Sequence, residues 1–159
     1  MRIVFLFIAL SLAITLSAQS NFVNQVKNIF EDASNNFLKY KGTQKPSLDT
    51  ASAYYNTTIT IDGTIDNDIF RDQLGYMYSA VIKDWVSKKE AKRIVEGWKM
   101  ELKDNFWPFK QQKEKSFTGV FSEDYIFKKN AITLAFCIVL SGDNKNYLVT
   151  LHISYYKEF

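Results

Sequence analysis

The stretch "ITLAFCIVLSGDNKNYLVTLHIS" (Ile132 to Ser154) decides the fold class of this chain of 159 residues. Large apolar residues alternate with smaller or polar ones on both sides of the turn-forming segment "SGDNKN", a pattern typical of two β-strands joined as an antiparallel hairpin. The bulky sets are Ile132, Leu134, Phe136, Ile138 and Leu140 in the first strand, and Val149, Leu151, Ile153 and Tyr155 in the second. Since a slip of one residue would exchange the two faces of a strand, the bulky sets must share one buried face.

The second face of this hairpin carries the single cysteine and the single histidine of the chain, Cys137 and His152, together with Thr150. A two-residue loop would place Cys137 and His152 directly opposite one another, and a four-residue loop would place them diagonally, with their Cβ atoms roughly 5 to 8 Å apart. The two side chains are therefore expected to be close enough for contact.

A reactive thiol needs more than a nearby histidine. Its thiolate must be stabilised by a helix N-terminus or a positive charge, and a further group must orient the base. Cys137 lies in mid-strand between Phe136 and Ile138, without such a feature in the sequence. We therefore interpret Cys137 as a small apolar residue of the sheet and His152 as a packed or surface histidine.

Hydrophobic periodicity predicts two amphipathic helices outside the hairpin. The first is expected over residues 21–40, and the second over residues 88–103. Ser87 and Glu90 form a capping-box pattern at the start of the second helix.

Alternating or β-rich segments predict three further strands, at residues 54–62, 75–83 and about 116–129. The 75–83 segment also fits a helix, and its aromatic and β-branched content favours a strand. We therefore predict an α+β fold in the order α-β-β-α-β-β-β, with an antiparallel sheet of about five strands and both helices packed on one face.

The first eighteen residues predict a cleaved secretory signal peptide. A basic Arg2 precedes an apolar run that is too short to span a bilayer comfortably, and small residues end at Ala18. Residues 19–159 are then expected to form one domain, located in the periplasm or outside the cell. No cysteine near the cleavage site can carry a lipid anchor.

Composition argues against several functional classes. Without Arg2 the net charge falls from +3 to about +2, and both signs are mixed along the chain, so the sequence lacks the basic footprint that nucleic acid requires. We expect no cofactor and no bound metal. Four aspartates crowd into "DGTIDNDIFRD" (residues 62–72), but their spacing does not fit a calcium loop, and a solvated acidic loop is favoured.

These observations favour a small exported, non-enzymatic binding domain, whose partner is a protein or a small amphipathic ligand. Candidate contact residues lie on the second sheet face (Cys137, Thr150, His152 and Tyr78) and in "NFWPFK" at residues 105–110 (Trp107 and Phe109). A homodimer through the open sheet face is another candidate arrangement. Two alternatives stay open: a carrier with an apolar cavity among Phe30, Phe37, Trp98 and Phe136, and an enzyme built on Cys137 and His152.

Overall fold

The structure is a computed structural model that describes residues 21–46, 51–115, 121–142 and 145–155. Residues 21–32 are helical, followed by the short 3-10 helix η1 (Ala33–Asn35), and the second helix is α2 (Lys88–Leu102). The eight strands are β1 (Lys41–Gln44), β2 (Ala53–Thr57), β3 (Asp66–Arg71), β4 (Tyr76–Val86), β5 (Lys110–Lys115), β6 (Phe121–Lys129), β7 (Ile132–Leu140) and β8 (Tyr147–Tyr155). The predicted signal peptide lies outside the described residues.

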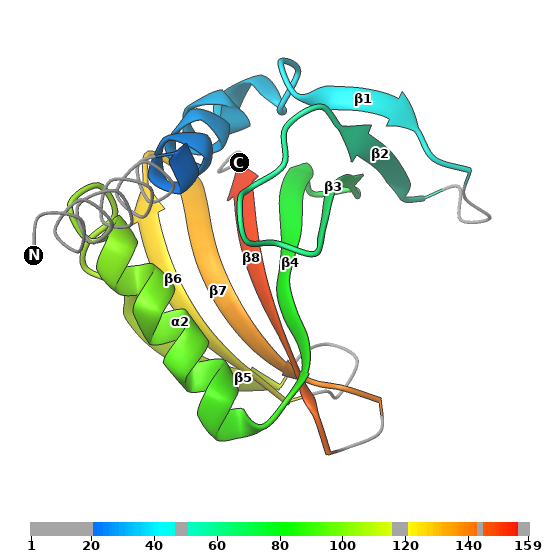
Figure 1. Ribbon diagram of the computed structural model, residues 1–159. Helices are drawn as coiled ribbons and strands as arrows, with labels where there is room; N and C mark the ends of the chain where they lie inside the picture. The colour runs from blue at the N-terminus through cyan, green and yellow to red at the C-terminus, as the bar shows by residue number, and fades with distance from the viewer. Residues whose placement is uncertain (1–20, 47–50, 116–120, 143–144, 156–159) are drawn as a thin grey trace, which may run out of the picture.

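All eight strands form one antiparallel sheet in the order β1-β2-β3-β4-β8-β7-β6-β5. Each half of the chain contributes a helix followed by a four-stranded meander, and the two halves join where β4 pairs with β8 at the centre of the sheet. The sheet is strongly bent, and both helices lie over its inner face (Figure 1). The opposite surface is called the outer face below.

The prediction of about five strands in the order α-β-β-α-β-β-β is wrong, because the sheet has eight strands in two sets of four. The missed strands are β1, β3 and β5, with the sequences "KGTQ", "DNDIFR" and "KQQKEK". β1 and β5 are the edges of the sheet, so they lack the continuous apolar face by which a strand is recognised.

The first helix also ends earlier than predicted. Its α-helical part stops at residue 32 instead of Tyr40, and η1 continues it for three residues. Asn36 and Phe37 then adopt left-handed backbone angles, with φ of 59° and 56°. Phe37 keeps the apolar spacing of the helix and is fully buried, so the periodicity extended past the true helix end.

The predicted helix at residues 88–103 is confirmed as α2, and so is its cap. The Ser87 hydroxyl accepts a hydrogen bond from the Glu90 backbone N–H at 3.3 Å. The strand prediction for residues 75–83 is confirmed by β4. No helix in the described ranges has both the length and the apolar content needed to cross a membrane.

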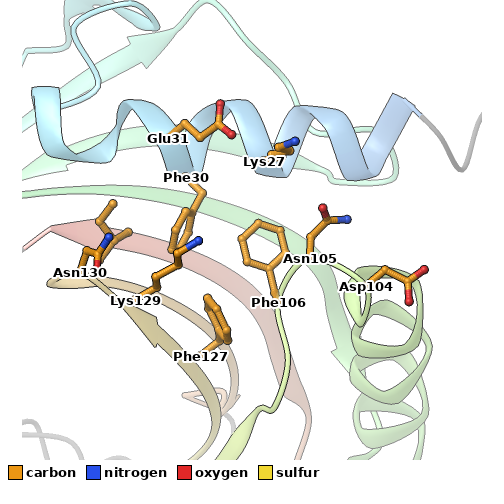
Figure 2. A pocket seen from close by; sticks show the side chains of 10 residues that line it. Lys27, Phe30, Glu31, Asp104, Asn105, Phe106, Phe127, Lys129 and Asn130 are labelled. Carbon is orange, nitrogen blue, oxygen red and sulfur yellow. The ribbon is translucent and has the colours of Figure 1, made fainter.

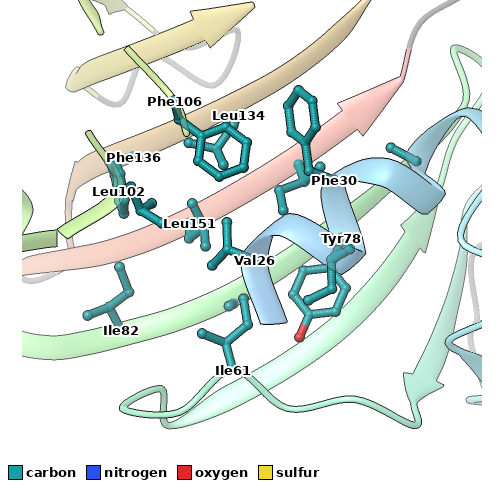
Figure 3. Packing of buried hydrophobic residues seen from close by; sticks show 14 of the residues in the cluster. Val26, Phe30, Ile61, Tyr78, Ile82, Leu102, Phe106, Leu134, Phe136 and Leu151 are labelled. Carbon is teal, nitrogen blue, oxygen red and sulfur yellow. The ribbon is translucent and has the colours of Figure 1, made fainter. Parts of the chain in front are cut away.

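The hydrophobic core lies between the inner face and the two helices (Figure 3). Val26 of the first helix lies beside Leu151 of β8, and Phe30 lies beside Phe106, with ring centroids 5.0 Å apart. Phe22 and Trp98 join the two helices through an edge-to-face ring contact, with centroids 4.3 Å apart. This packing fixes the first helix over the sheet.

A buried carboxylate, Glu123 of β6, holds α2 on the inner face. The Lys92 Nζ lies 3.0 Å from Glu123 Oε1, and Lys88 Nζ lies 3.8 Å from Oε2. Gln111 and the Tyr125 hydroxyl also donate hydrogen bonds to Oε1. Burial alone would raise the pKa of Glu123, but the hydrogen bonds and the lysine charges outweigh it and keep the pKa below its ordinary value.

Candidate functional site

Cys137 and His152 lie on the outer face, as diagonal neighbours across the β7–β8 ladder. Cys137 pairs with Thr150, and His152 pairs with Ala135. The Ser141 N–H donates to the Asn146 carbonyl at 2.8 Å, which closes a four-residue loop between them. Of the two registers expected from the sequence, the structure has the one with the four-residue loop.

Both groups are held in their uncharged forms. Burial, and then the neighbouring Asp124 carboxylate, raise the pKa of the Cys137 thiol well above its ordinary value. Burial lowers the pKa of His152 to about 4. The His152 Nε2 lies 2.7 Å from the Thr150 hydroxyl, while its buried Nδ1 has no hydrogen-bond partner in the described part of the chain. At neutral pH the pair therefore consists of a thiol and a weakly basic, neutral imidazole.

Tyr78 lies on the opposite side of the sheet from this pair. It is fully buried on the inner face, and its hydroxyl donates to Asn67 Oδ1 at 2.6 Å and approaches the Ile59 carbonyl at 3.1 Å. Burial raises the pKa of this hydroxyl. Tyr78 is thus a core residue that fixes the loop before β3.

The acidic segment at residues 62–72 is held by the protein's own donors. Asp62 accepts hydrogen bonds from the Asn21 and Gln25 amides at 2.7 and 3.1 Å. Asp68 pairs with Lys45, and Asp72 accepts from two backbone N–H groups in the β3–β4 turn. Among the described residues, no cluster of three or more metal-ligating side chains occurs.

The "NFWPFK" segment forms a corner between the end of α2 and β5. The Asn105 and Phe106 N–H groups donate to the Leu102 carbonyl, which turns the chain out of the helix. Phe106 is buried, whereas the Trp107 side chain is 58% exposed. Phe109 is partly buried and contacts the rings of Phe127 and Phe136, with centroids 6.2 and 5.6 Å away.

Beside this corner lies a pocket of about 440 Å³, which we call the corner pocket (Figure 2). It opens between the first helix, the segment after α2, and the β6–β7 turn. Its lining residues are Lys27, Phe30, Glu31, Asp104, Asn105, Phe106, Phe127, Lys129, Asn130 and Ile132.

The apolar floor of the corner pocket is a cluster of three aromatic rings. Phe30, Phe106 and Phe127 contact one another with centroid distances of 5.0 to 6.0 Å. Phe30 and Phe106 are nearly buried, and Phe127 is partly exposed. Because each ring also packs into the core, the floor is rigid and already formed.

The rim of the corner pocket is charged. Lys27, Glu31, Asp104 and Lys129 are exposed and stand around the phenylalanine cluster (Figure 2). Within the described ranges, these four side chains form no ion pair and no side-chain hydrogen bond. The rim thus presents two cationic and two anionic groups that are exposed and not paired with any other described residue.

Two smaller hollows flank the exposed Trp107. One, of about 330 Å³, is lined by Met100, Lys103, Asp104 and Trp107. The other, of about 390 Å³, is lined by Trp107, Pro108, Lys110, Gln112, Ile126, Phe127 and Lys128. The corner pocket shares a lining residue with each of these hollows, Asp104 with the first and Phe127 with the second.

The structure separates the residues singled out from the sequence. Cys137, Thr150 and His152 stand together on the outer face, Tyr78 is in the core, and Trp107 and Phe109 are at the corner. Sequence reasoning missed the charged rim of the corner pocket and the meeting of its three rings, whose residues come from three distant segments. Two signals pointed to this part of the molecule: the aromatic spacing of "NFWPFK", and Phe30, which was named for an apolar cavity with other partners.

No known protein family model, curated protein or solved structure matches this chain. A proposal for its function therefore rests on the geometry and electrostatics of its own residues.

Proposed function

We propose that this chain is a small exported, non-enzymatic binding domain that holds a small amphipathic ligand in the corner pocket. The observation that carries the proposal is the pairing of an aromatic floor with charged side chains that form no ion pair with another described residue. The volume of about 440 Å³ falls in the range of known ligand pockets.

An amphipathic ligand fits this arrangement for a simple physical reason. Its apolar part would cover the exposed surface of Phe127 and the edges of Phe30 and Phe106, which gains roughly 25 cal/mol for each Å² removed from water. Its polar part would meet Lys27 or Lys129 at the rim without displacing an ion pair to any other described residue.

The uncharged states of the Cys137 thiol and the His152 imidazole support a non-enzymatic role. A thiol whose pKa is raised and an imidazole whose pKa is about 4 have little capacity for nucleophilic or base chemistry at neutral pH. The carrier alternative is also less favoured in its internal form, because Phe37 and Phe136 are fully buried against their neighbours. Phe30, by contrast, lines the open corner pocket.

The test is a titration of the isotopically labelled protein with a panel of small amphipathic molecules, followed by amide NMR. We expect shifts confined to the three segments that line the corner pocket, at residues 27–31, 104–106 and 127–132. Shifts clustered around Cys137 and His152 instead, or no shifts with any molecule, would contradict the proposal.

Two variants sharpen this test. Lys129→Trp places a bulky ring at an exposed rim position at the end of β6 and should block binding without disturbing the core. Phe70→Trp, on the outer face where Phe70 contacts Tyr54, is the matched control and should bind normally. Equal binding by both variants would place the ligand elsewhere.

A protein partner at Trp107 is a second candidate function. A large aromatic that is 58% exposed between two hollows has the character of an interface anchor. Crosslinked pull-down from the native envelope and culture fluid, with the wild type and with Trp107→Ala, tests it. A stoichiometric partner that is retained by Trp107→Ala would exclude this anchor.

A further inference from the structure

The charges around the corner pocket are balanced. Lys27 and Lys129 contribute two positive charges, and Glu31 and Asp104 contribute two negative ones. Both signs occur on either side of the phenylalanine cluster: Glu31 and Lys129 lie to one side of it, and Lys27 and Asp104 to the other (Figure 2). A ligand on the aromatic floor would therefore be within the field of both signs at once.

We propose that the corner pocket selects an apolar zwitterion, of which an aromatic or aliphatic α-amino acid is the simplest form. This inference rests on the proposed function and names its ligand class. The ligand's carboxylate is received by a rim lysine, its ammonium group by a rim carboxylate, and its side chain by the three rings. Asn105 and Asn130 add amide donors and acceptors on the same rim.

Ligands of one charge are disfavoured by the same balance. An apolar anion, such as a fatty acid, gains from the two lysines but is repelled by Glu31 and Asp104. An apolar cation meets the reverse situation with Lys27 and Lys129. A zwitterion gains at both signs, because two charges of each sign surround one floor and none of them is in an ion pair with another described residue.

Four probes that share one phenyl group separate these possibilities: L-phenylalanine, 3-phenylpropionate, 2-phenylethylamine and N-acetyl-L-phenylalanine amide. Their dissociation constants are measured at neutral pH and low salt by amide NMR titration of the purified protein. We expect phenylalanine to bind about fivefold more tightly than each of the other three, as contacts at a rim open to water contribute modestly.

The outcomes distinguish this inference from the proposed function. Tighter or equal binding of phenylpropionate, phenylethylamine or the neutral amide at the corner pocket would overturn the zwitterion inference and leave a binding site for that class. Failure of all four probes to shift the pocket's resonances would overturn both.

Rim variants supply a second, independent measurement. Lys129→Gln and Glu31→Gln, at two exposed positions on the same side of the phenylalanine cluster, should each weaken phenylalanine binding about fivefold and leave binding of the neutral amide unchanged. Lys128→Gln is the matched control, because the adjacent lysine lines a different hollow. Unchanged phenylalanine affinity in both rim variants, or an equal loss in the control, would refute the assignment.

Discussion

Replacing Glu123 by glutamine removes the charge that holds α2 against the sheet, and we expect it to lower the free energy of unfolding by about 2 kcal/mol at pH 7. The side chain of Glu123 is 1% exposed, whereas its partner Lys92 is 44% exposed. Breaking a fully buried pair costs about 3 to 5 kcal/mol, and an exposed pair contributes about 0.2 to 1. One buried and one half-exposed partner place the expected loss between these limits.

The pH dependence of this loss follows from the lowered pKa of Glu123. A carboxyl whose folded pKa lies below its unfolded value of 4.5 stabilises the fold fully above pH 4.5. That contribution disappears as the pH falls through the folded pKa. The difference between wild type and Glu123→Gln should therefore be largest at neutral pH and should shrink below pH 4.5.

Urea denaturation at several pH values between 3 and 7 measures this difference, since urea does not screen charges. Glu96→Gln is the matched control, because Glu96 is 57% exposed in its pair with Lys99 and should lose less than about 0.5 kcal/mol. If Glu123→Gln were as stable as the wild type, or if its deficit were the same at pH 3 and pH 7, the argument for an anchoring charge would be refuted.

Three further predictions concern single side chains. The pKa of His152 is lowered to about 4 in the folded protein from an unfolded value of 6.5, so the free energy of unfolding of the wild type should fall by no more than about 3 kcal/mol between pH 6.5 and pH 4. Urea denaturation should show a smaller loss for His152→Gln over the same interval. Cys137 in the native protein should react with iodoacetamide at pH 7.5 more slowly than a free cysteine peptide, and faster reaction would contradict its raised pKa. Ser87→Ala should cost about 1 kcal/mol through loss of the cap on α2, whereas Ser87→Asp should retain most of the stability in the same assay, and equal losses in both would exclude the capping role.

The parts of the fold that sequence reasoning predicted are those with a strong apolar pattern. The hairpin of β7 and β8 has one bulky face, so only registers that differ by two residues keep that face buried. The pattern therefore predicted that Cys137 and His152 share the opposite face. The helix α2 was predicted because its apolar stripe and the Ser87 cap agree.

The missed elements lack such a pattern. β1 and β5 are polar because they form the edges, and β3 alternates acidic residues on its outer face with few apolar ones on the inner face. The corner pocket was invisible to local reasoning because Phe30, Phe106 and Phe127 belong to three elements that meet only in the folded chain. Apolar periodicity indicates which side of a helix or strand is buried. It does not indicate which elements form a pocket where they meet in the folded chain.

The pairing of β4 with β8 at the centre of the sheet has a consequence for the order of folding. Tyr78 lies opposite Ile153, so the middle of the sheet joins residues from the two halves of the chain, and each meander is left with an unpaired strand until the other arrives. Loop closure over such a separation makes folding slow compared with a fold built from local contacts. If the chain is exported as we propose, this delay leaves time for the translocation machinery to engage it while it is still extended.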